Sequence, residues 1–170
     1  MKDMHKKTKA VASLGVFTAL ALLLSYVEFL LPPLFVAVPG IKIGLPNVII
    51  ILALYMVGLR SAIAISLLRV ILSSIIFGNA MVFAYSIAGA ILSITVMAIL
   101  KKTDILSPVG VSVAGGVAHN MGQTIVAVIL LDTPQIAYYM IVLTLTGIAS
   151  GAFVGLLGGF LMKRIPKNKL

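Results

Sequence analysis

Long apolar runs separated by short polar or basic segments make up most of the chain. The first run extends from about residue 10 to residue 31, which is long enough for a membrane-spanning helix of about 20 apolar residues. Five further runs follow, interrupted by turns that contain Gly, Pro, Asn, Asp or paired Lys. The pattern predicts six spans over residues 10–31, 46–58, 61–77, 81–100, 109–131 and 136–162.

The spans at 46–58 and 61–77 are short, so a five-span or re-entrant arrangement is the alternative. The positions of the basic residues favour six spans. Eleven of the thirteen Lys and Arg then lie on the side that the two termini share: Lys2, Lys6, Lys7, Lys9, Arg60, Lys101, Lys102, Lys163, Arg164, Lys167 and Lys169. Because cytoplasmic loops are enriched in Lys and Arg, both termini are predicted to be cytoplasmic.

The composition excludes two other classes of protein. Hydrophobic residues make up 61% of the chain and charged residues 10%, against about 25% charged residues in soluble domains. The mean hydropathy of +1.21 excludes a soluble globular fold, and the low charge excludes intrinsic disorder. We expect an all-α integral membrane protein with a single transmembrane domain over residues 1–170, located as a multi-pass protein in a bacterial plasma membrane.

The residues that carry reaction chemistry are sparse. The net charge of +9 comes from the segments between spans, so it indicates topology and no nucleic-acid partner. The absence of Cys and the presence of only two His leave no metal site, and we expect no cofactor. The four acidic residues are isolated from one another, and no phosphate-binding Gly-Lys-Ser/Thr loop is present. These features predict a binder or carrier rather than an enzyme.

Small residues recur at helical spacing in the sixth predicted span. Gly147, Gly151, Gly155 and Gly159 are four residues apart, so one face of this helix carries no side chains. Such a face lets the backbone of another helix approach closely. The pattern predicts tight packing within one bundle, with a subunit interface as the alternative.

Polar residues at membrane depth are candidate functional residues, because an ionisable group there is costly unless it is paired or hydrated. Arg69 lies near the middle of the third span, and Glu28, near the end of the first, is the most available carboxylate. A structural Arg69–Glu28 pair and a ligand-binding arginine both explain this pattern. His119 and Gln123 share one helix face beside Asn120, where they would bind a polar ligand or tie helices together.

Asn47 follows Pro46 at the start of the second span, where free backbone N–H groups and the helix dipole favour an anion. An ordinary helix cap is the alternative. Tyrosines near the ends of the spans would stack on a ligand or belong to aromatic belts. The candidate substrate-binding residues are Glu28, Lys42, Asn47, Tyr55, Arg69, Asn79, Tyr85, His119, Asn120 and Gln123.

Several segments of the chain match the pattern of a known family. They are 40–47, Leu54–Gly58, Leu68–Leu72, Phe77-Gly78, Tyr85–Ala90 and Ala118–Gln123. With the basic N-terminus and the small residues of the first span, they resemble the Gx transporter family, which is also catalogued as heptaprenyl diphosphate synthase component I. The resemblance covers nearly the whole chain.

The wider group resembles the substrate-binding S components of energy-coupling factor (ECF) vitamin transporters. This resemblance implies six helices, a ligand pocket toward the outer side, and a helix-one Ala-xxx-Ala motif that docks a transmembrane coupling subunit working with ATP-binding subunits. Gly15 and Ala19, beside Ala12, stand at the docking motif, with Gly in place of the first Ala. The implied function is capture of a vitamin-like or cofactor-like molecule for uptake, with the lipid bilayer, the ligand and the coupling subunits as partners.

The synthase name leads to a second hypothesis. Chain-elongating prenyltransferases resemble one another in Asp-Asp-x-x-Asp motifs that bind diphosphate through Mg²⁺, whereas this chain has three aspartates, at positions 3, 104 and 132. The alternative role is therefore a non-catalytic membrane accessory subunit of a prenyl diphosphate/quinone system or of a flavin-dependent extracellular electron-transfer system. A small oligomeric channel is a third hypothesis, although the sequence has no repeated polar stripe to line a pore.

Overall fold

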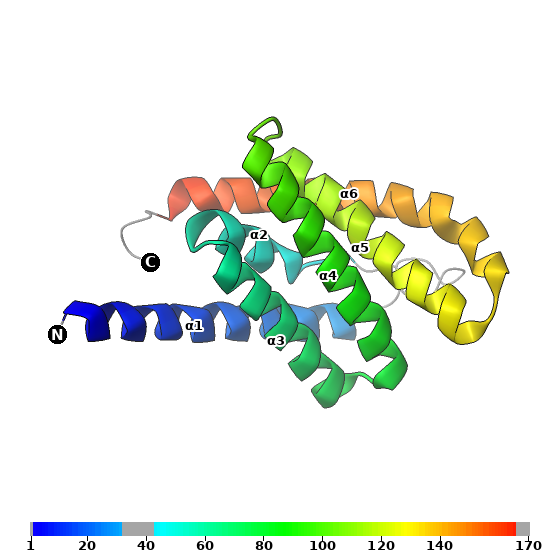
Figure 1. Cartoon of the computed structure of the whole chain (residues 1–170), viewed down its shortest axis with the longest axis horizontal. Helices are drawn as coiled ribbons and strands as arrows, with labels where there is room; N and C mark the ends of the chain where they lie inside the picture. Colours follow the sequence, from blue (N-terminus) through cyan, green and yellow to red (C-terminus); the bar gives the residue numbers. More distant parts are fainter. Residues whose placement is uncertain (1, 32–42, 166–170) are drawn as a thin grey trace.

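A computed structural model describes residues 2–31 and 43–165, apart from the side chains of residues 2–7, 136 and 137. Within these ranges the chain forms helices and no strand (Figure 1). In chain order the elements are α1 (Lys2–Leu30), α2 (Asn47–Met56), α3 (Leu59–Phe77), α4 (Ala80–Thr103), α5 (Pro108–Leu131), the short 3₁₀ helix η1 (Pro134–Tyr139) and α6 (Met140–Arg164).

Local signals in the sequence explain where the helices begin and end. The side chain of Asn79 accepts a hydrogen bond of 2.9 Å from the Val82 N–H and so caps the start of α4. Ser107 does the same for α5, ahead of Pro108 in the first helical turn. Asp104 and Asp132 adopt left-handed backbone conformations that end α4 and α5.

Five of the helices are long and apolar enough to cross a membrane: α1, α3, α4, α5 and α6. The predicted spans at 61–77, 81–100 and 109–131 therefore match α3, α4 and α5 closely. Helix α2 has 10 residues, which gives a length of about 15 Å, half the thickness of the hydrocarbon core. The second predicted span is thus shorter in the structure, and the count of six crossings and the cytoplasmic termini stay predictions.

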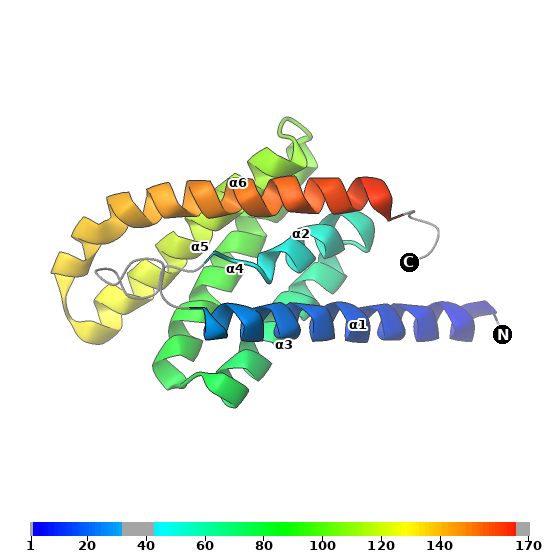
Figure 2. The same ribbon diagram turned by 180° about the vertical axis from the view of Figure 1, so that it is seen from behind.

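Helix α2 forms the centre of the hydrophobic core. All residues from Val48 to Leu54 are buried, so this helix is apolar on every side and is enclosed by other helices. It packs against α1, α3 and α6 (Figure 2). At its end, the Lys101 ammonium of α4 donates a hydrogen bond to the carbonyl of Leu54, where the negative end of the helix dipole favours a cation.

The glycine face of α6 packs against α5. A Cβ atom built on Gly151 would lie 2.6 Å from the Val113 Cα, and one built on Gly155 would lie 2.7 Å from the Val109 Cα. Gly147 is similarly close to α5, at 3.0 Å from the Val117 Cα. Gly159 differs from the other three, because a Cβ there would meet no atom within 4 Å.

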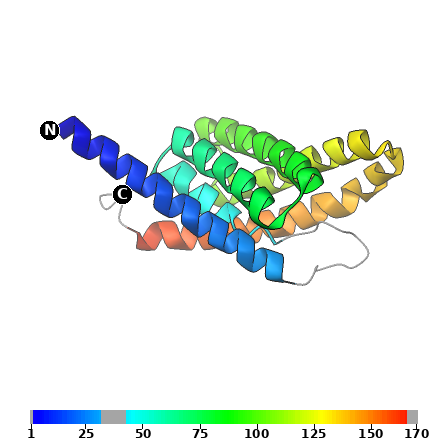
Figure 3. The same cartoon turned by 90° about the horizontal axis from the view of Figure 1, so that it is seen from below.

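The N-terminal end of α1 and the C-terminal end of α6 lie at the same end of the molecule (Figure 1). Figure 1 shows the N-terminal end of α1 and the C-terminal end of α6 on the left, and α3 also begins on that side. Figure 3 shows that the N-terminal end of α1 extends beyond the other helices. Ala12, Gly15 and Ala19 of α1 are exposed, and a Cβ on Gly15 would meet no atom within 4 Å.

Candidate functional site

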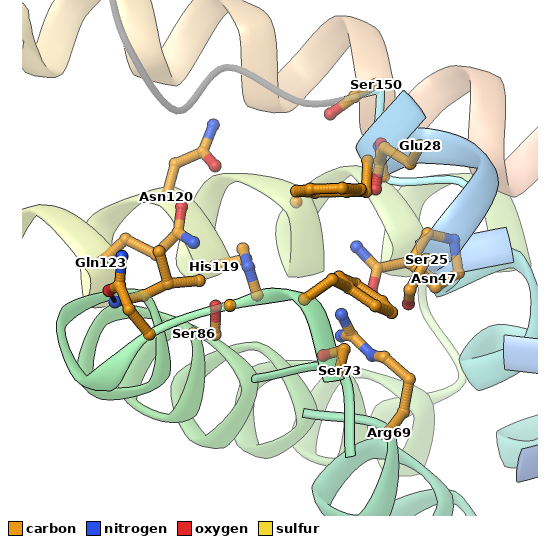
Figure 4. Close-up of a pocket in the computed structure, with 18 residues that line it drawn as sticks. Ser25, Glu28, Asn47, Arg69, Ser73, Ser86, His119, Asn120, Gln123 and Ser150 are labelled. Carbon is orange, nitrogen blue, oxygen red and sulfur yellow. Dashed lines mark hydrogen bonds between the residues drawn. The ribbon is translucent and has the colours of Figure 1, made fainter. Parts of the chain in front are cut away.

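A cavity of about 390 Å³ lies where α1 ends and α2 begins, between α3, α4, α5 and α6. Its size is in the range of small-molecule binding sites, about 300–1,000 Å³. Polar side chains from all six helices line it (Figure 4): Ser25, Glu28, Asn47, Arg69, Ser73, Ser86, His119, Asn120, Gln123 and Ser150. Segments far apart in the sequence therefore meet at one polar site inside an otherwise apolar bundle.

Arg69 brings a positive charge to the cavity. Its Nε atom is buried and has no hydrogen-bond partner among the described residues. Figure 4 shows its side chain directed among the labelled residues, with Ser73 beside the guanidinium group. A buried guanidinium Nε that makes no hydrogen bond to the described part of the chain is costly, and an anionic group on a ligand would satisfy it.

Glu28 is engaged by the backbone ahead of α2 and not by Arg69. Its Oε1 accepts hydrogen bonds from the N–H groups of Gly44 and Leu45, the latter at 3.3 Å. Within residues 2–31 and 43–165, Glu28 and Arg69 act on each other electrostatically without forming an ion pair. Of the two interpretations left open by the sequence, the geometry therefore favours a ligand-binding arginine over a structural pair.

The polar residues His119, Asn120 and Gln123 of α5 make two kinds of contact. The Asn120 amide donates a hydrogen bond of 2.7 Å to the Leu143 carbonyl and so ties α5 to α6. His119 and Gln123 pack closely over Gly89 of α4, because a Cβ at Gly89 would lie 2.9 Å from the Gln123 Cγ and 3.0 Å from the His119 Cε1. Gly89 thus creates the space in which these two side chains reach the cavity.

The start of α2 is not an open anion site. The N–H groups of Asn47, Val48 and Ile49 each donate a hydrogen bond to the carbonyl three residues earlier in the chain, beginning with that of Gly44. The donor–acceptor distances are 2.9–3.1 Å. Pro46 is the N-cap residue, and no side chain caps the helix. Because these amides already have backbone partners, the geometry does not favour an anion bound by the backbone at this helix start, and Asn47 lines the cavity with its side chain.

Four further predicted residues need a correction or a limit. Tyr55 and Tyr85 are absent from the described lining of the cavity. Tyr55 lies at the far end of α2, where its ring lies 4.9 Å from the Lys101 ammonium. Asn79 lines the cavity, but its side chain oxygen is used to cap α4. Lys42 lies outside the described residues.

Two aromatic rings and several serines that the sequence did not single out also line the cavity. The rings of Phe29 and Phe77 contact each other with their centroids 5.2 Å apart. They give the cavity an apolar aromatic wall, the kind of surface that we had expected from tyrosines. Serines are common in membrane helices, so the sequence alone did not indicate that these four line the cavity: Ser25, Ser73, Ser86 and Ser150.

The described residues hold no cluster of three or more His, Cys, Asp or Glu side chains that would bind a metal ion. Among the described residues, the cavity lining supplies a guanidinium, a carboxylate, an imidazole, neutral amides, hydroxyls and an aromatic wall. Such groups can hold a polar ligand through charge and hydrogen bonds.

The fold and the cavity define a helical membrane protein with a polar internal site. A family model described as heptaprenyl diphosphate synthase component I matches residues 17–161. Because the match covers most of the chain, the protein belongs to this family. No curated protein and no solved structure gives a significant match to the chain.

Proposed function

We propose that this protein is a membrane subunit that binds a small molecule with an anionic group in the cavity around Arg69. The buried guanidinium Nε, which has no hydrogen-bond partner in the described chain, carries the proposal. A carboxylate or phosphate can accept two parallel hydrogen bonds from a guanidinium, which gives both affinity and orientation. The bound anion would replace the partner that Glu28 does not provide.

The arrangement of the other side chains suggests the shape of the ligand. Figure 4 shows Arg69, Ser25 and Asn47 at one side of the cavity, and Ser86, His119 and Gln123 at the other. A molecule with an anionic end and a neutral, hydrogen-bonding end fits both sides. The wall formed by Phe29 and Phe77 suits a flat or apolar middle portion. A vitamin-like or cofactor-like molecule has these properties.

We further propose that the protein acts as an S-component-like capture subunit and not as an enzyme. Energy for uptake would then come from separate coupling and ATP-binding subunits. The exposed small residues Ala12, Gly15 and Ala19 on α1 are the proposed docking face, since they leave room for another helix to approach. The single carboxylate of the cavity agrees with binding without catalysis.

Native mass spectrometry of protein purified gently from its own membranes tests the binding role. We expect a co-purifying anionic small molecule that is identified after extraction. Arg69→Ala should weaken its retention roughly ten- to hundredfold, because a charge-assisted hydrogen bond is lost. Arg69→Lys keeps the charge without the paired donors and should retain an intermediate amount.

Arg60→Ala is the matched control, because Arg60 is an exposed arginine in the first turn of the same helix. It should retain the compound as the unmodified protein does. Equal retention by Arg69→Ala and Arg60→Ala, with both variants folded, would overturn the proposed site.

The name of the matching family favours one second function, a non-catalytic accessory subunit of a prenyl diphosphate synthase. In that role the protein would anchor or dock a soluble enzyme, and the cavity would not hold a soluble ligand. The same purification distinguishes the two functions. An empty protein that arrives with prenyl-transfer or quinone-pathway partners supports the accessory role and contradicts ligand capture.

A further inference from the structure

A second hollow lies on the outer surface at the far end of α2 from the cavity. Its volume is about 560 Å³, and its lining includes Tyr55 of α2, Val109 of α5, and Leu156, Gly159, Phe160 and Lys163 of α6. We call it the α2–α6 groove. Figure 2 shows α2 lying beside the C-terminal half of α6, where the groove is located.

The walls of the groove are apolar and open to the surroundings. Leu156 and Phe160 are 64% and 56% exposed. Together with Gly159 and Lys163 they occupy one face of α6 over two turns, a length of about 10 Å. Gly159 keeps this face hollow, because a Cβ there would meet no atom within 4 Å. Gly159 therefore opens the groove, whereas the three preceding glycines of the series pack against α5.

Positive charge gathers at one end of the groove. Lys163 lies in its lining, and Arg164 follows with its guanidinium 5.3 Å from the centroid of the Phe160 ring. The Lys101 ammonium lies 4.9 Å from the centroid of the Tyr55 ring and donates to a backbone carbonyl. Asp104 is the acidic residue near Tyr55, so positive charges outnumber negative ones here.

We propose that the α2–α6 groove binds an anionic phospholipid. One acyl chain lies along Leu156, Gly159 and Phe160, and the headgroup phosphate contacts Lys163. An apolar groove on a membrane helix bundle is filled by lipid because water is excluded there. A lysine at the end of such a helix places its ammonium at headgroup level, where it attracts anionic lipid. The charge at one end and the apolar face at the other match the two parts of a phospholipid.

The test uses the full chain in detergent and native mass spectrometry. The protein is mixed with equal amounts of phosphatidylglycerol and phosphatidylcholine that carry the same acyl chains, so that only the headgroup differs. We expect phosphatidylglycerol to be retained in preference to phosphatidylcholine. Lys163→Gln should reduce this preference roughly fivefold, as expected for one cation near a phosphate.

Two pairs of variants separate the groove from general effects. Gly159→Leu fills the groove and should reduce retention of both lipids, whereas Gly15→Leu adds the same side chain to an open face of α1 and should not. Lys9→Gln removes an exposed lysine outside the groove and should leave the preference unchanged. Thermal unfolding checks that each variant is folded.

The proposal fails if the unmodified protein retains both lipids equally, or if Lys163→Gln and Lys9→Gln give the same preference. It also fails if inorganic phosphate alone displaces the lipid, since the acyl chain would then contribute nothing. Arg69→Ala should not change the lipid preference, because Arg69 lies in the cavity and not in the groove. The lipid site can therefore fail or hold independently of the small-molecule cavity.

Discussion

At the scale of single residues, Glu28 and Arg69 show how one cavity uses two opposite charges differently. A carboxylate oxygen of Glu28 accepts hydrogen bonds from the backbone N–H groups of Gly44 and Leu45, which lie just before α2. Arg69 keeps a buried Nε without a partner in the described chain. Glu28 therefore holds the backbone of the site together, and Arg69 is the residue that we propose to bind a ligand.

Replacing Glu28 tests this division. Glu28→Ala removes the acceptor for two backbone N–H groups, and we expect it to destabilise the folded protein by about 1–3 kcal/mol. Glu28→Gln keeps a side-chain oxygen that can accept the same hydrogen bonds and should lose less. Thermal unfolding followed by circular dichroism in detergent measures both. Equal unfolding temperatures for Glu28→Ala and the unmodified protein would show that Glu28 does not hold this segment.

At the scale of elements, the glycine series of α6 separates into packing and non-packing positions. A Cβ at Gly151 would lie 2.6 Å from the Val113 Cα and 2.8 Å from the Ser112 carbonyl oxygen, and both are backbone atoms that cannot rotate away. Gly159 follows two turns later on the same face of α6, but a Cβ built there would meet no atom within 4 Å. Regular spacing in the sequence therefore does not make these glycines equivalent.

We expect Gly151→Ala to lower stability by about 1–3 kcal/mol, because α5 and α6 must move apart to accept the methyl group. Gly159→Ala should change stability little and gain slightly from the higher helix propensity of Ala. Folded yield in membranes and thermal unfolding compare the pair. An unchanged unfolding temperature for Gly151→Ala would mean that the face of α6 around Gly151 is not in close contact with α5.

Helix positions could be predicted from the sequence because they depend on run length and on local end signals. The span predicted at 109–131 matches α5 at Pro108–Leu131, where Ser107 and Pro108 mark the start. The direction of side chains could not be predicted as well. A helix such as α2 is apolar on every side, so nothing in its sequence shows that Asn47 faces the polar cavity or that Tyr55 faces a groove beside α6.

Within the candidate site, the charged residues could be predicted and the neutral ones mostly could not. Arg69 and Glu28 stand out because charge is rare and costly inside a membrane. Ser73 and Ser86 look like any other small residue of an apolar helix, and their role depends on how α3 and α4 are rotated in the bundle. That rotation follows from contacts between helices that are distant in sequence, such as Gly122 of α5 against the Ala88 carbonyl of α4.

At the scale of the whole molecule, α2 links the two regions that we propose to bind ligands. Its first residue, Asn47, lines the cavity, and its last turn, with Tyr55, lines the α2–α6 groove. The helix is held by the acidic side chain of Glu28 just ahead of its start and by the basic side chain of Lys101 at its end. Both charges complement the helix dipole, so a short helix has a defined place in the core.

The path of α2 also bears on the membrane topology. Figure 1 shows α2 running leftward from near the C-terminal end of α1 to the place where α3 begins, opposite to the direction of α1. Six crossings therefore stay our prediction, with α2 making part of the second one. Reporter fusions at Leu170 and near Asp104 should then report the cytoplasm, and a fusion near Asp132 should report the outside. If the chain crossed only five times, the N-terminus and Leu170 would lie on opposite sides, because removing the crossing at α2 inverts either the N-terminus alone or every later segment. A reporter at the N-terminus that gives the opposite signal to the one at Leu170 would therefore contradict six crossings.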